Sequence, residues 1–351
     1  MRHTIAGAMN PGPSVLKPLD ARAKPGSPTA ARGRPPLARA ILAALCVASF
    51  VSASTGTAPQ SPRPSSAKVV SPAAAMTNAL AKGFGSRPGA GAVMEVVSGG
   101  ILASKDMPLA ARRLVLPGST IEPFVLFALI DSGTVSADQS FICPMKLEID
   151  GTRLDCPHPE KKGPLLPGAA LAYTCNNFFA RYATRLTAAE MARALGQWGF
   201  ASKVPLFGDQ LAGEIVTART PGEVQRQALG EFGIHVTPLG LLQAYRRLAL
   251  RRRNPATHGE SLNPVLAALE GSVNYGMAKA ARTEGLSAAG IAGTSLAEEG
   301  SWSHGWFTGY APANMPEIAV VIFLERSRGP GDAAAIAHDV FIAYRDAKPK
   351  R

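Results

Sequence analysis

Long apolar runs are scarce in this sequence of 351 residues. The longest, residues 40–51, has twelve mostly apolar residues, which is too few to span a bilayer comfortably. A basic flank precedes it and the small residues Ser52 and Ala53 follow it, which is the pattern of a secretory signal. We therefore predict that the chain is exported, with residues 40–53 forming either the apolar core of a signal peptide or a short membrane anchor.

Acidic residues are also few, with 25 Asp and Glu against 37 Lys and Arg, which gives a net charge of +12. The first 40 residues hold seven basic side chains and one acidic side chain, Asp20, and so carry half of this excess. The dense basic group at residues 246–253 falls at the end of an expected helix and has no interleaved aromatic residues. We therefore expect no nucleic-acid partner, and favour a solvated face or contact with an anionic membrane or cell-wall polymer.

Composition divides the chain into segments. Residues 1–39 are basic, rich in Pro and Ala and without periodicity, so we expect a disordered leader. Beyond the apolar run, residues 54–88 are rich in Ser, Pro, Ala and Gly, which predicts a flexible linker. Residues 89–347 are enough chain for one well-packed domain.

Within residues 89–347, apolar residues recur with the period of a strand in some stretches and with the period of a helix in others. Strands are expected at residues 92–97 and 100–104 near the start, and at 289–296, 302–310 and 318–325 near the end. Helices are expected at residues 120–132, 168–185, 187–198 and 237–252, with a closing helix at 332–346. This order predicts an α+β domain in which strands distant in the sequence share one sheet.

Only four cysteines occur, and three of them follow the apolar run: Cys143, Cys156 and Cys175. Cys143 and Cys156 flank the turn signal Asp150-Gly151, which predicts a hairpin. In an oxidising compartment these two thiols either form a disulfide or stay free, because the sequence does not fix their separation. Cys175 would be left free. We predict no metal site, because no second group of Cys or His stands at ligand spacing.

The stretch around which the chain is organised is residues 117–124, a Pro-Gly turn that opens into an apolar run. It places Ser119 near the start of a helix, where unpaired N–H groups and the positive end of the helix dipole favour developing negative charge. This position suits a nucleophile. Ser119 and Glu122 also form the pattern Ser-x-x-Glu of a capping box, so both interpretations stay open.

Several passages, in order along residues 91–346, resemble the transpeptidase domain of penicillin-binding proteins. They are residues 117–124 (PGSTIEPF), 173–179 (YTCNNFF), 228–239 (ALGEFGIHVTPL), 290–294 (GIAGT) and 304–312 (HGWFTGYAP). The resemblance implies a β-lactamase/transpeptidase-like α+β fold, with an antiparallel sheet of N- and C-terminal strands packed against a helical region. No glycosyltransferase region or large dimerisation module is recognised.

The resemblance also implies a catalytic site built from the motifs Ser-x-x-Lys, Ser-x-Asn and Lys-Thr-Gly. In the family, the serine attacks the carbonyl between two D-alanines of a peptidoglycan stem, and the first lysine helps to remove the serine proton. Ser119 is kept here, but Glu122 stands in place of that lysine. Thr174 and Asn176 stand for the second motif, where threonine keeps the hydroxyl.

The third motif departs further from the family pattern. Its lysine, which holds the substrate or penicillin carboxylate in the family, is Ile291 here, and its threonine is Ala292. Gly293 and Thr294 remain as candidate substrate-binding residues, or as a strand kept for its shape. The lysines that could reach the site through the fold are Lys105, Lys203 and Lys279.

Two functions from different classes follow from the sequence. The first is an exported, non-catalytic transpeptidase-like protein of the periplasm or cell envelope, with a cleft for a peptidoglycan stem peptide or a β-lactam. The second is an active serine D,D-peptidase or transpeptidase, acylated at Ser119 with Glu122 as a rewired base. We favour the first, because activated nucleophiles depend on their base. A scaffold without a ligand is a third hypothesis. None of them requires a cofactor, and the oligomeric state is not predicted.

Overall fold

The computed structural model describes residues 71–160, 163–202, 209–257 and 259–348. The predicted leader, the apolar run 40–51 and the first part of the predicted linker lie outside the described residues. Within the described part of the chain, no helix is both long and apolar enough to cross a membrane.

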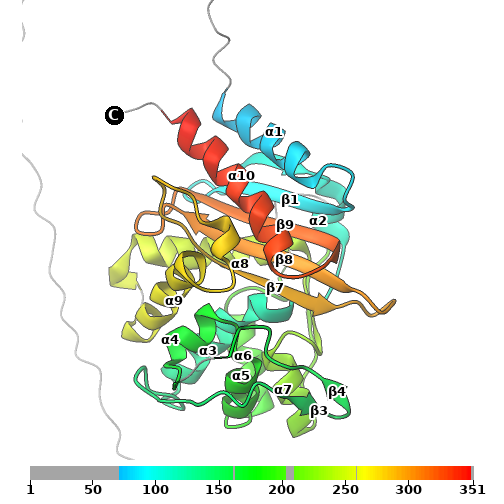
Figure 1. The fold of residues 1–351 in the computed structure, drawn as a ribbon, viewed down its shortest axis with the longest axis vertical. Helices are drawn as coiled ribbons and strands as arrows, with labels where there is room; N and C mark the ends of the chain where they lie inside the picture. Colours follow the sequence, from blue (N-terminus) through cyan, green and yellow to red (C-terminus); the bar gives the residue numbers. More distant parts are fainter. Residues whose placement is uncertain (1–70, 161–162, 203–208, 258, 349–351) are drawn as a thin grey trace, which may run out of the picture. The chain divides into compact units, whose positions relative to one another are not determined.

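A five-stranded antiparallel sheet is the centre of the fold (Figure 1). Its strands lie in the order β2-β1-β9-β8-β7, so the first strands of the domain and the last share one sheet. In β1 and β9, Gly89 lies opposite Leu324. The prediction of a sheet closed by sequence-distant strands is confirmed. The strands are β1 (Gly89–Glu95), β2 (Ile101–Lys105), β7 (Ala289–Leu296), β8 (Ser303–Ala311) and β9 (Ile318–Ser327).

Both faces of this sheet are buried, because successive side chains along each strand point to opposite faces. On β9, Val321 and Phe323 pack into the core of the helical region, whereas Val320 and Ile322 pack against the two terminal helices. In Figure 1 these terminal helices lie together above the sheet, away from the helical region. The helices named here are α1 (Pro72–Phe84) and α10 (Gly331–Ala347) on one face, and α8 (Pro238–Arg253) on the other.

Helix α1 lies in the stretch that the sequence predicted as a linker. Its buried residues Met76, Leu80 and Phe84 recur every four positions and form one apolar stripe. A Cβ atom on Gly91 of β1 would lie 2.9 Å from Leu80 Cδ2, so the helix and the strand are in direct contact. The linker prediction is therefore wrong for residues 72–84, because three well-spaced apolar side chains suffice to dock a helix on the sheet.

The expected helix at 168–185 is broken into two. α4 (Pro167–Ala172) and α5 (Asn176–Ala183) are separated by a turn at Thr174. Thr174 has a φ of 48°, in the left-handed region that the interior of a helix excludes. The break leaves Cys175, rather than Thr174, as the N-cap residue of α5.

The remaining predicted elements lie close to their expected positions. The predicted hairpin turns at Asp150 and Gly151, which both have a positive φ. The predicted elements are η1 (Gly118–Ile121) followed by α3 (Glu122–Asp131), the hairpin β3 (Glu148–Ile149) and β4 (Thr152–Arg153), and α6 (Ala188–Gly196). Besides α1, the elements that were not predicted are α2 (Met107–Arg112), β5 (Glu214–Ile215), α7 (Pro221–Ala228), β6 (Ile234–His235), η2 (Pro255–Thr257), η3 (Glu260–Leu262), α9 (Asn263–Asn274) and η4 (Lys279–Ala281).

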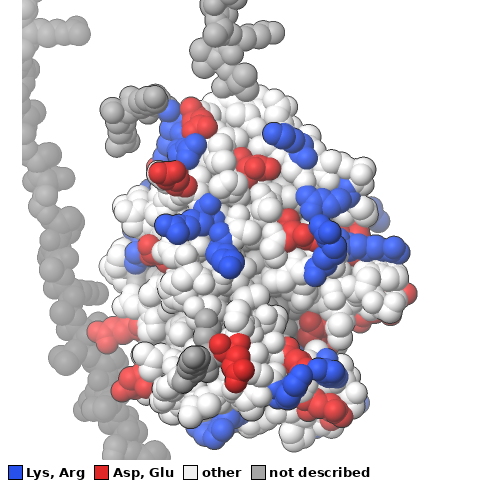
Figure 2. All heavy atoms as spheres, in the orientation of Figure 1, with Lys and Arg blue, Asp and Glu red and all other residues white. Residues whose placement is uncertain are grey.

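The basic group near the end of α8 has structural partners. Arg251 stacks on the Trp198 ring at 4.1 Å from its centroid. Acidic and basic side chains are interspersed on the face shown in Figure 2. Guanidinium groups of α8 also bind backbone carbonyls beyond the helix, and these bonds are Arg246 to Val96 and Val97, Arg252 to Ala313, and Arg253 to Pro316.

Candidate functional site

Ser119 lies in η1, held against the edge strand β7 by close backbone packing. A Cβ atom on Gly118 would lie 2.0 Å from the carbonyl oxygen of Thr294, and one on Gly293 would lie 3.0 Å from Ser119 Cβ. The N–H of Gly118 donates to the carbonyl oxygen of Gly230 at 3.1 Å. Gly118 also has a φ of 53°, which favours glycine. These contacts between main chains fix the position of Ser119.

Ser119 is not a helix cap. It lies inside the 3₁₀ turn, and α3 begins only at Glu122, with Ile121 as an N-cap that makes no side-chain bond. The capping-box interpretation of Ser119 and Glu122 is therefore wrong. Two capping boxes do occur in the described chain, and they pair Thr187 with Glu190 and Thr220 with Glu223.

The Ser119 side chain lines a cavity of about 160 Å³, which we call the serine cavity. Asn176 and Thr294 line the same cavity, and Gly293 lies against Ser119, so four of the predicted site residues come together. Thr174 is 1% exposed and is not part of the described lining. The lining that sequence reasoning missed comprises Arg153, Leu154, Asp155, Pro157, Leu229, Glu231, Ser295, Leu296 and Ser303.

Glu122 is completely buried next to Ser119. Burial raises the pKa of its carboxyl group well above the ordinary value, because the charged form loses its hydration. The Ser119 hydroxyl is near enough to oppose this rise. Among the described residues, however, neither carboxyl oxygen has a partner in good hydrogen-bond geometry. Burial therefore favours the neutral form of Glu122.

No described side chain in the serine cavity replaces the anion-binding lysine of the third motif. Ile291, at the position of that lysine, is fully buried in the apolar core. The cation among the described lining residues is Arg153, and it pairs at 2.6 Å with Asp155, which also pairs with Lys146. The lysines proposed as substitutes lie elsewhere: Lys105 packs over the Phe84 ring, Lys279 lines another cavity, and Lys203 lies outside the described residues.

A second carboxyl group, that of Glu231, lines the serine cavity and was not predicted. It follows Gly230, whose carbonyl oxygen binds the residue before Ser119. Its Oε2 accepts a hydrogen bond from the N–H of Leu296 at 3.0 Å. Burial raises the pKa of Glu231 to about 8, and the bond from Leu296 opposes that rise. The only sequence signal for this residue was its place in the passage 228–239.

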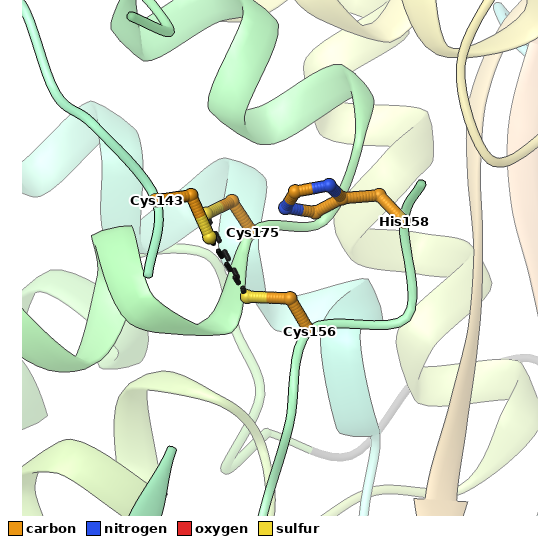
Figure 3. Close-up of side chains that lie close together, drawn as sticks. All are labelled: Cys143, Cys156, His158 and Cys175. Carbon is orange, nitrogen blue, oxygen red and sulfur yellow. Dashed lines mark hydrogen bonds between the residues drawn. The ribbon is translucent and has the colours of Figure 1, made fainter. Parts of the chain in front are cut away.

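Next to the serine cavity, three sulfurs and an imidazole form a second cluster (Figure 3). We call Cys143, Cys156, His158 and Cys175 the cysteine–histidine cluster, because their ligand atoms all lie within 4.8 Å of one another. Cys156 Sγ lies 3.4 Å from Cys143 Sγ and 3.8 Å from Cys175 Sγ. Figure 3 shows the His158 ring directed towards the sulfurs. Cys143 is partly exposed, and the other three residues are buried.

These distances suit a metal ion better than a disulfide. The three cysteines are free, so the structure does not contain the disulfide considered for Cys143 and Cys156. Two sulfurs bound to one tetrahedral Zn²⁺ at about 2.3 Å lie about 3.8 Å apart. His158 Nδ1 donates to the carbonyl oxygen of Pro159 at 2.8 Å, which leaves the lone pair on Nε2, as in many metal-binding histidines. The cluster therefore has the donor set and the spacing of a Cys₃His site.

The three thiols differ in how readily they lose a proton. A hydrogen bond from Cys175 lowers the pKa of Cys156, whereas the same bond raises the pKa of Cys175 and burial raises that of Cys143. Cys156 is thus the preferred thiolate. A divalent ion would displace the protons of the other two thiols, because metal ligands bind in their deprotonated form.

Residues 153–158, which we call the wall segment, separate the serine cavity from the cluster. Four of them line the cavity and the other two belong to the cluster. Amides at the start of α5 hold this segment. Asn176 Nδ2 donates to the carbonyl oxygen of Leu154 at 3.0 Å, and Asn177 Nδ2 donates to Cys156 Sγ at 3.2 Å. The cluster and the cavity lining therefore share one segment of the chain.

Residues 89–341 match the sequence model of the penicillin-binding protein transpeptidase domain. The chain belongs to this family. The match covers the sheet, the serine cavity and the cysteine–histidine cluster, and it confirms the resemblance seen in the sequence.

Comparison with individual proteins agrees with this assignment. The peptidoglycan D,D-transpeptidase MrdA of Acinetobacter baumannii is 25% identical over 292 residues, which cover 67% of this chain and 44% of the relative. The chain thus spans less than half the length of this curated relative. The D,D-transpeptidase domain of a peptidoglycan glycosyltransferase from Eggerthella lenta has a TM-score of 0.68 and 21% identity, with 78% of this chain and 81% of that chain covered. The transpeptidase domain of penicillin-binding protein 3 from Burkholderia pseudomallei has a TM-score of 0.68 and 20% identity, with 83% and 98% covered. The predicted transpeptidase-like α+β fold is confirmed.

Proposed function

We propose that this chain is an exported, peptidoglycan-associated transpeptidase-like domain whose catalysis is degenerate. In this proposal the serine cavity binds a peptidoglycan stem peptide or a partner segment without efficient acylation of Ser119. The observation that carries the proposal is the state of Glu122. It is buried, and burial favours its neutral form, at the position where the family has the lysine that helps to activate the serine.

A neutral carboxylic acid can donate a proton but cannot take one from a hydroxyl group. Removing the general base in such a site costs about 10²–10⁴-fold in rate. A neutral Glu122 beside Ser119 therefore supports a site that retains its geometry but has no general base to activate the serine.

The groups available for substrate recognition also support a site without efficient catalysis. The buried side chain of Ile291 offers nothing to a carboxylate, and Arg153 is already paired with Asp155. The serine cavity, at about 160 Å³, is also smaller than the roughly 300–1,000 Å³ of typical small-molecule sites. A penicillin carboxylate would therefore lack its usual anchor here.

A second candidate function, an active serine D,D-peptidase or transpeptidase, rests on the same raised pKa. An ionised Glu122 with such a pKa would be a stronger base than an ordinary glutamate, and it lies beside Ser119. Glu231, with a pKa of about 8, offers another proton acceptor in the cavity. Activity of this kind would rise with pH as these groups ionise.

Acylation by a penicillin separates the two functions. The full chain is incubated with a fluorescent penicillin at pH 7 and at pH 9, and intact-mass spectrometry reports any adduct, with Ser119→Ala as the control. We expect no adduct at pH 7 after hours at millimolar drug. A stoichiometric adduct within minutes that requires Ser119 would overturn the degenerate assignment. An adduct that forms only at pH 9 would favour the rewired base.

Binding to the cell wall tests the remaining part of the proposal. We expect the chain to sediment with purified peptidoglycan sacculi, and a bulky substitution in the serine cavity, Thr294→Trp, to weaken this binding. Export and anchoring through residues 40–53 are tested by cell fractionation and by sequencing the mature N-terminus. Recovery of the uncleaved chain in the cytosol would overturn export.

A further inference from the structure

We propose that Cys143 and Cys156 form a peroxide-sensitive pair, and that joining them as a disulfide releases a divalent ion from the cysteine–histidine cluster and loosens the wall segment. The proposal goes beyond the function given above, because no step in it requires Ser119 to react or the serine cavity to be filled.

Access and distance select this pair among the three thiols. Cys143 is partly exposed, whereas Cys156 and Cys175 are 8% and 0% exposed. An incoming peroxide therefore reaches Cys143 first. The resolving thiol is then Cys156, because its Sγ lies 3.4 Å from Cys143 Sγ. Cys175 lies deeper, with its Sγ 3.8 Å from Cys156 Sγ.

Both sulfurs of the pair are held by N–H groups and by a shared turn. The N–H of Met145 donates to Cys143 Sγ at 3.3 Å, and the carbonyl oxygen of Met145 accepts from the N–H of Cys156 at 2.9 Å. The backbone N–H and the side-chain amide of Asn177 donate to Cys156 Sγ at 3.4 Å and 3.2 Å. The two sulfurs therefore already face each other and need only to close the remaining gap.

The reaction balances with a hydroperoxide as the oxidant. The Cys143 thiolate attacks one peroxide oxygen, the O–O bond breaks, and a sulfenic acid and a hydroxide or alkoxide form. The Cys156 thiolate then attacks the Cys143 sulfur, the S–O bond breaks, and hydroxide leaves as the S–S bond forms. The two sulfurs lose two electrons in total and the peroxide gains them. Both thiolates are present when a divalent ion has displaced the thiol protons.

Disulfide formation has two consequences for the molecule. It removes two of the four donors of the cluster, so a bound ion keeps only His158 and Cys175 and is released. It also draws Cys156 Sγ towards Cys143, since an S–S bond is about 2.05 Å long. Cys156 lies in the wall segment, and its movement strains the bond from Asn177 that holds this segment at the start of α5.

The test uses the full chain, reduced and loaded with Zn²⁺, after removal of unbound metal. Hydrogen peroxide is added in steps, released zinc is measured with a chromogenic chelator, and disulfides are located by peptide mass mapping. We expect about one zinc ion released for each Cys143–Cys156 disulfide, with Cys175 still alkylatable. A thiol reductant with added Zn²⁺ should restore the starting state. Zinc release without a disulfide, a disulfide that includes Cys175, or a reduced chain that retains no zinc would each overturn the proposal.

Two variants and one further measurement sharpen the test. Cys46→Ser removes the one cysteine outside the cluster and should behave as the parent chain. Cys143→Ser should lose peroxide-dependent disulfide formation. If this variant does not fold, peptide mass mapping of the oxidised parent chain still shows which cysteines are joined. Hydrogen exchange of the wall segment should increase on oxidation and return on reduction with Zn²⁺. Unchanged exchange in the fully oxidised chain would contradict the loosening of the cavity wall.

Discussion

The serine cavity and the cysteine–histidine cluster lie on the two sides of the wall segment. The cavity is defined by its backbone packing and the cluster by its side chains. At the cavity, the main-chain contacts next to Ser119 leave no room for a Cβ atom at Gly118, and we propose that the charged side chains of the family motifs have been replaced. At the cluster, loops and the start of α5 carry four side chains whose ligand atoms all lie within 4.8 Å of one another. Under the proposed function, backbone packing holds the shape of the cavity after its chemistry has changed, whereas the cluster is defined by its side chains.

Restoring a charge on the cavity side should have the largest effect. Ile291→Lys places an ammonium group in the apolar core, where an unpaired charge costs about 3–5 kcal/mol. We expect this loss in the free energy of unfolding, measured by urea denaturation. The volume-conserving control Ile291→Met should cost less than about 1.5 kcal/mol. A stable Ile291→Lys variant that is acylated by penicillin would show instead that the lysine reaches the cavity.

On the cluster side, removal of metal should be nearly as costly. Zn²⁺ at about 1,000 times its dissociation constant would stabilise the fold by about 4 kcal/mol. We therefore expect a chelator to lower the melting temperature of the zinc-loaded chain by roughly 10 °C. His158→Ala should reduce this difference, whereas His338→Ala, at a ring bound to the carbonyl oxygen of Arg282, should keep it. Equal melting temperatures with and without zinc would show that the cluster does not bind a stabilising metal ion.

A substitution at Glu122 should have a smaller effect, and it should stabilise the fold rather than destabilise it. Its raised pKa means that the folded chain keeps a proton that the unfolded chain loses above the ordinary value of 4.5, so stability falls as the pH rises through this window. Glu122→Gln removes this loss and should stabilise the fold at pH 8 relative to the parent chain. At pH 4 the variant and the parent should melt together. A variant that is less stable at pH 8 would show that Glu122 is charged and paired.

The smallest effect concerns the serine itself. Because Ser119 makes no capping bond, Ser119→Ala should change the free energy of unfolding by less than about 0.5 kcal/mol. Thr220→Ala, at a capping box that is present, should cost about 1 kcal/mol. Thermal denaturation of the two variants side by side measures this difference. Equal losses would mean that the serine has a structural role that its contacts do not reveal.

Much of the fold was predictable because its signals are periodic. The three C-terminal strands and the helices at α3, α6, α8 and α10 follow from apolar spacing, and the Asp150-Gly151 turn follows from its dipeptide. The break at Thr174 was not predictable in this way, because the apolar spacing continues through it. Helix α1 was missed because residues 54–88 were assigned to a linker from their overall composition, although Ser71 as N-cap and the spacing of Met76, Leu80 and Phe84 are local helix signals.

The site was predictable in part for a related reason. Ser119, Asn176 and Thr294 were found through their resemblance to the family motifs, and they do line one cavity. Glu231 and the wall segment carry no motif, so only the fold brings them there. The cluster escaped detection because its residues, separated by 12, 1 and 16 positions, fit no common ligand spacing. Their ligand atoms meet only when the hairpin folds back onto the start of α5.

Helix α1 also sets where the folded unit can be cut. The match to the family begins at residue 89, whereas the apolar stripe of α1 already covers β1 from residue 76 onward. A recombinant fragment that starts at residue 89 would lose the packing of Leu80 and Phe84 over Gly91 and so expose part of this face of the sheet. Such a fragment is expected to aggregate. Soluble production therefore requires a start at or before Ser71.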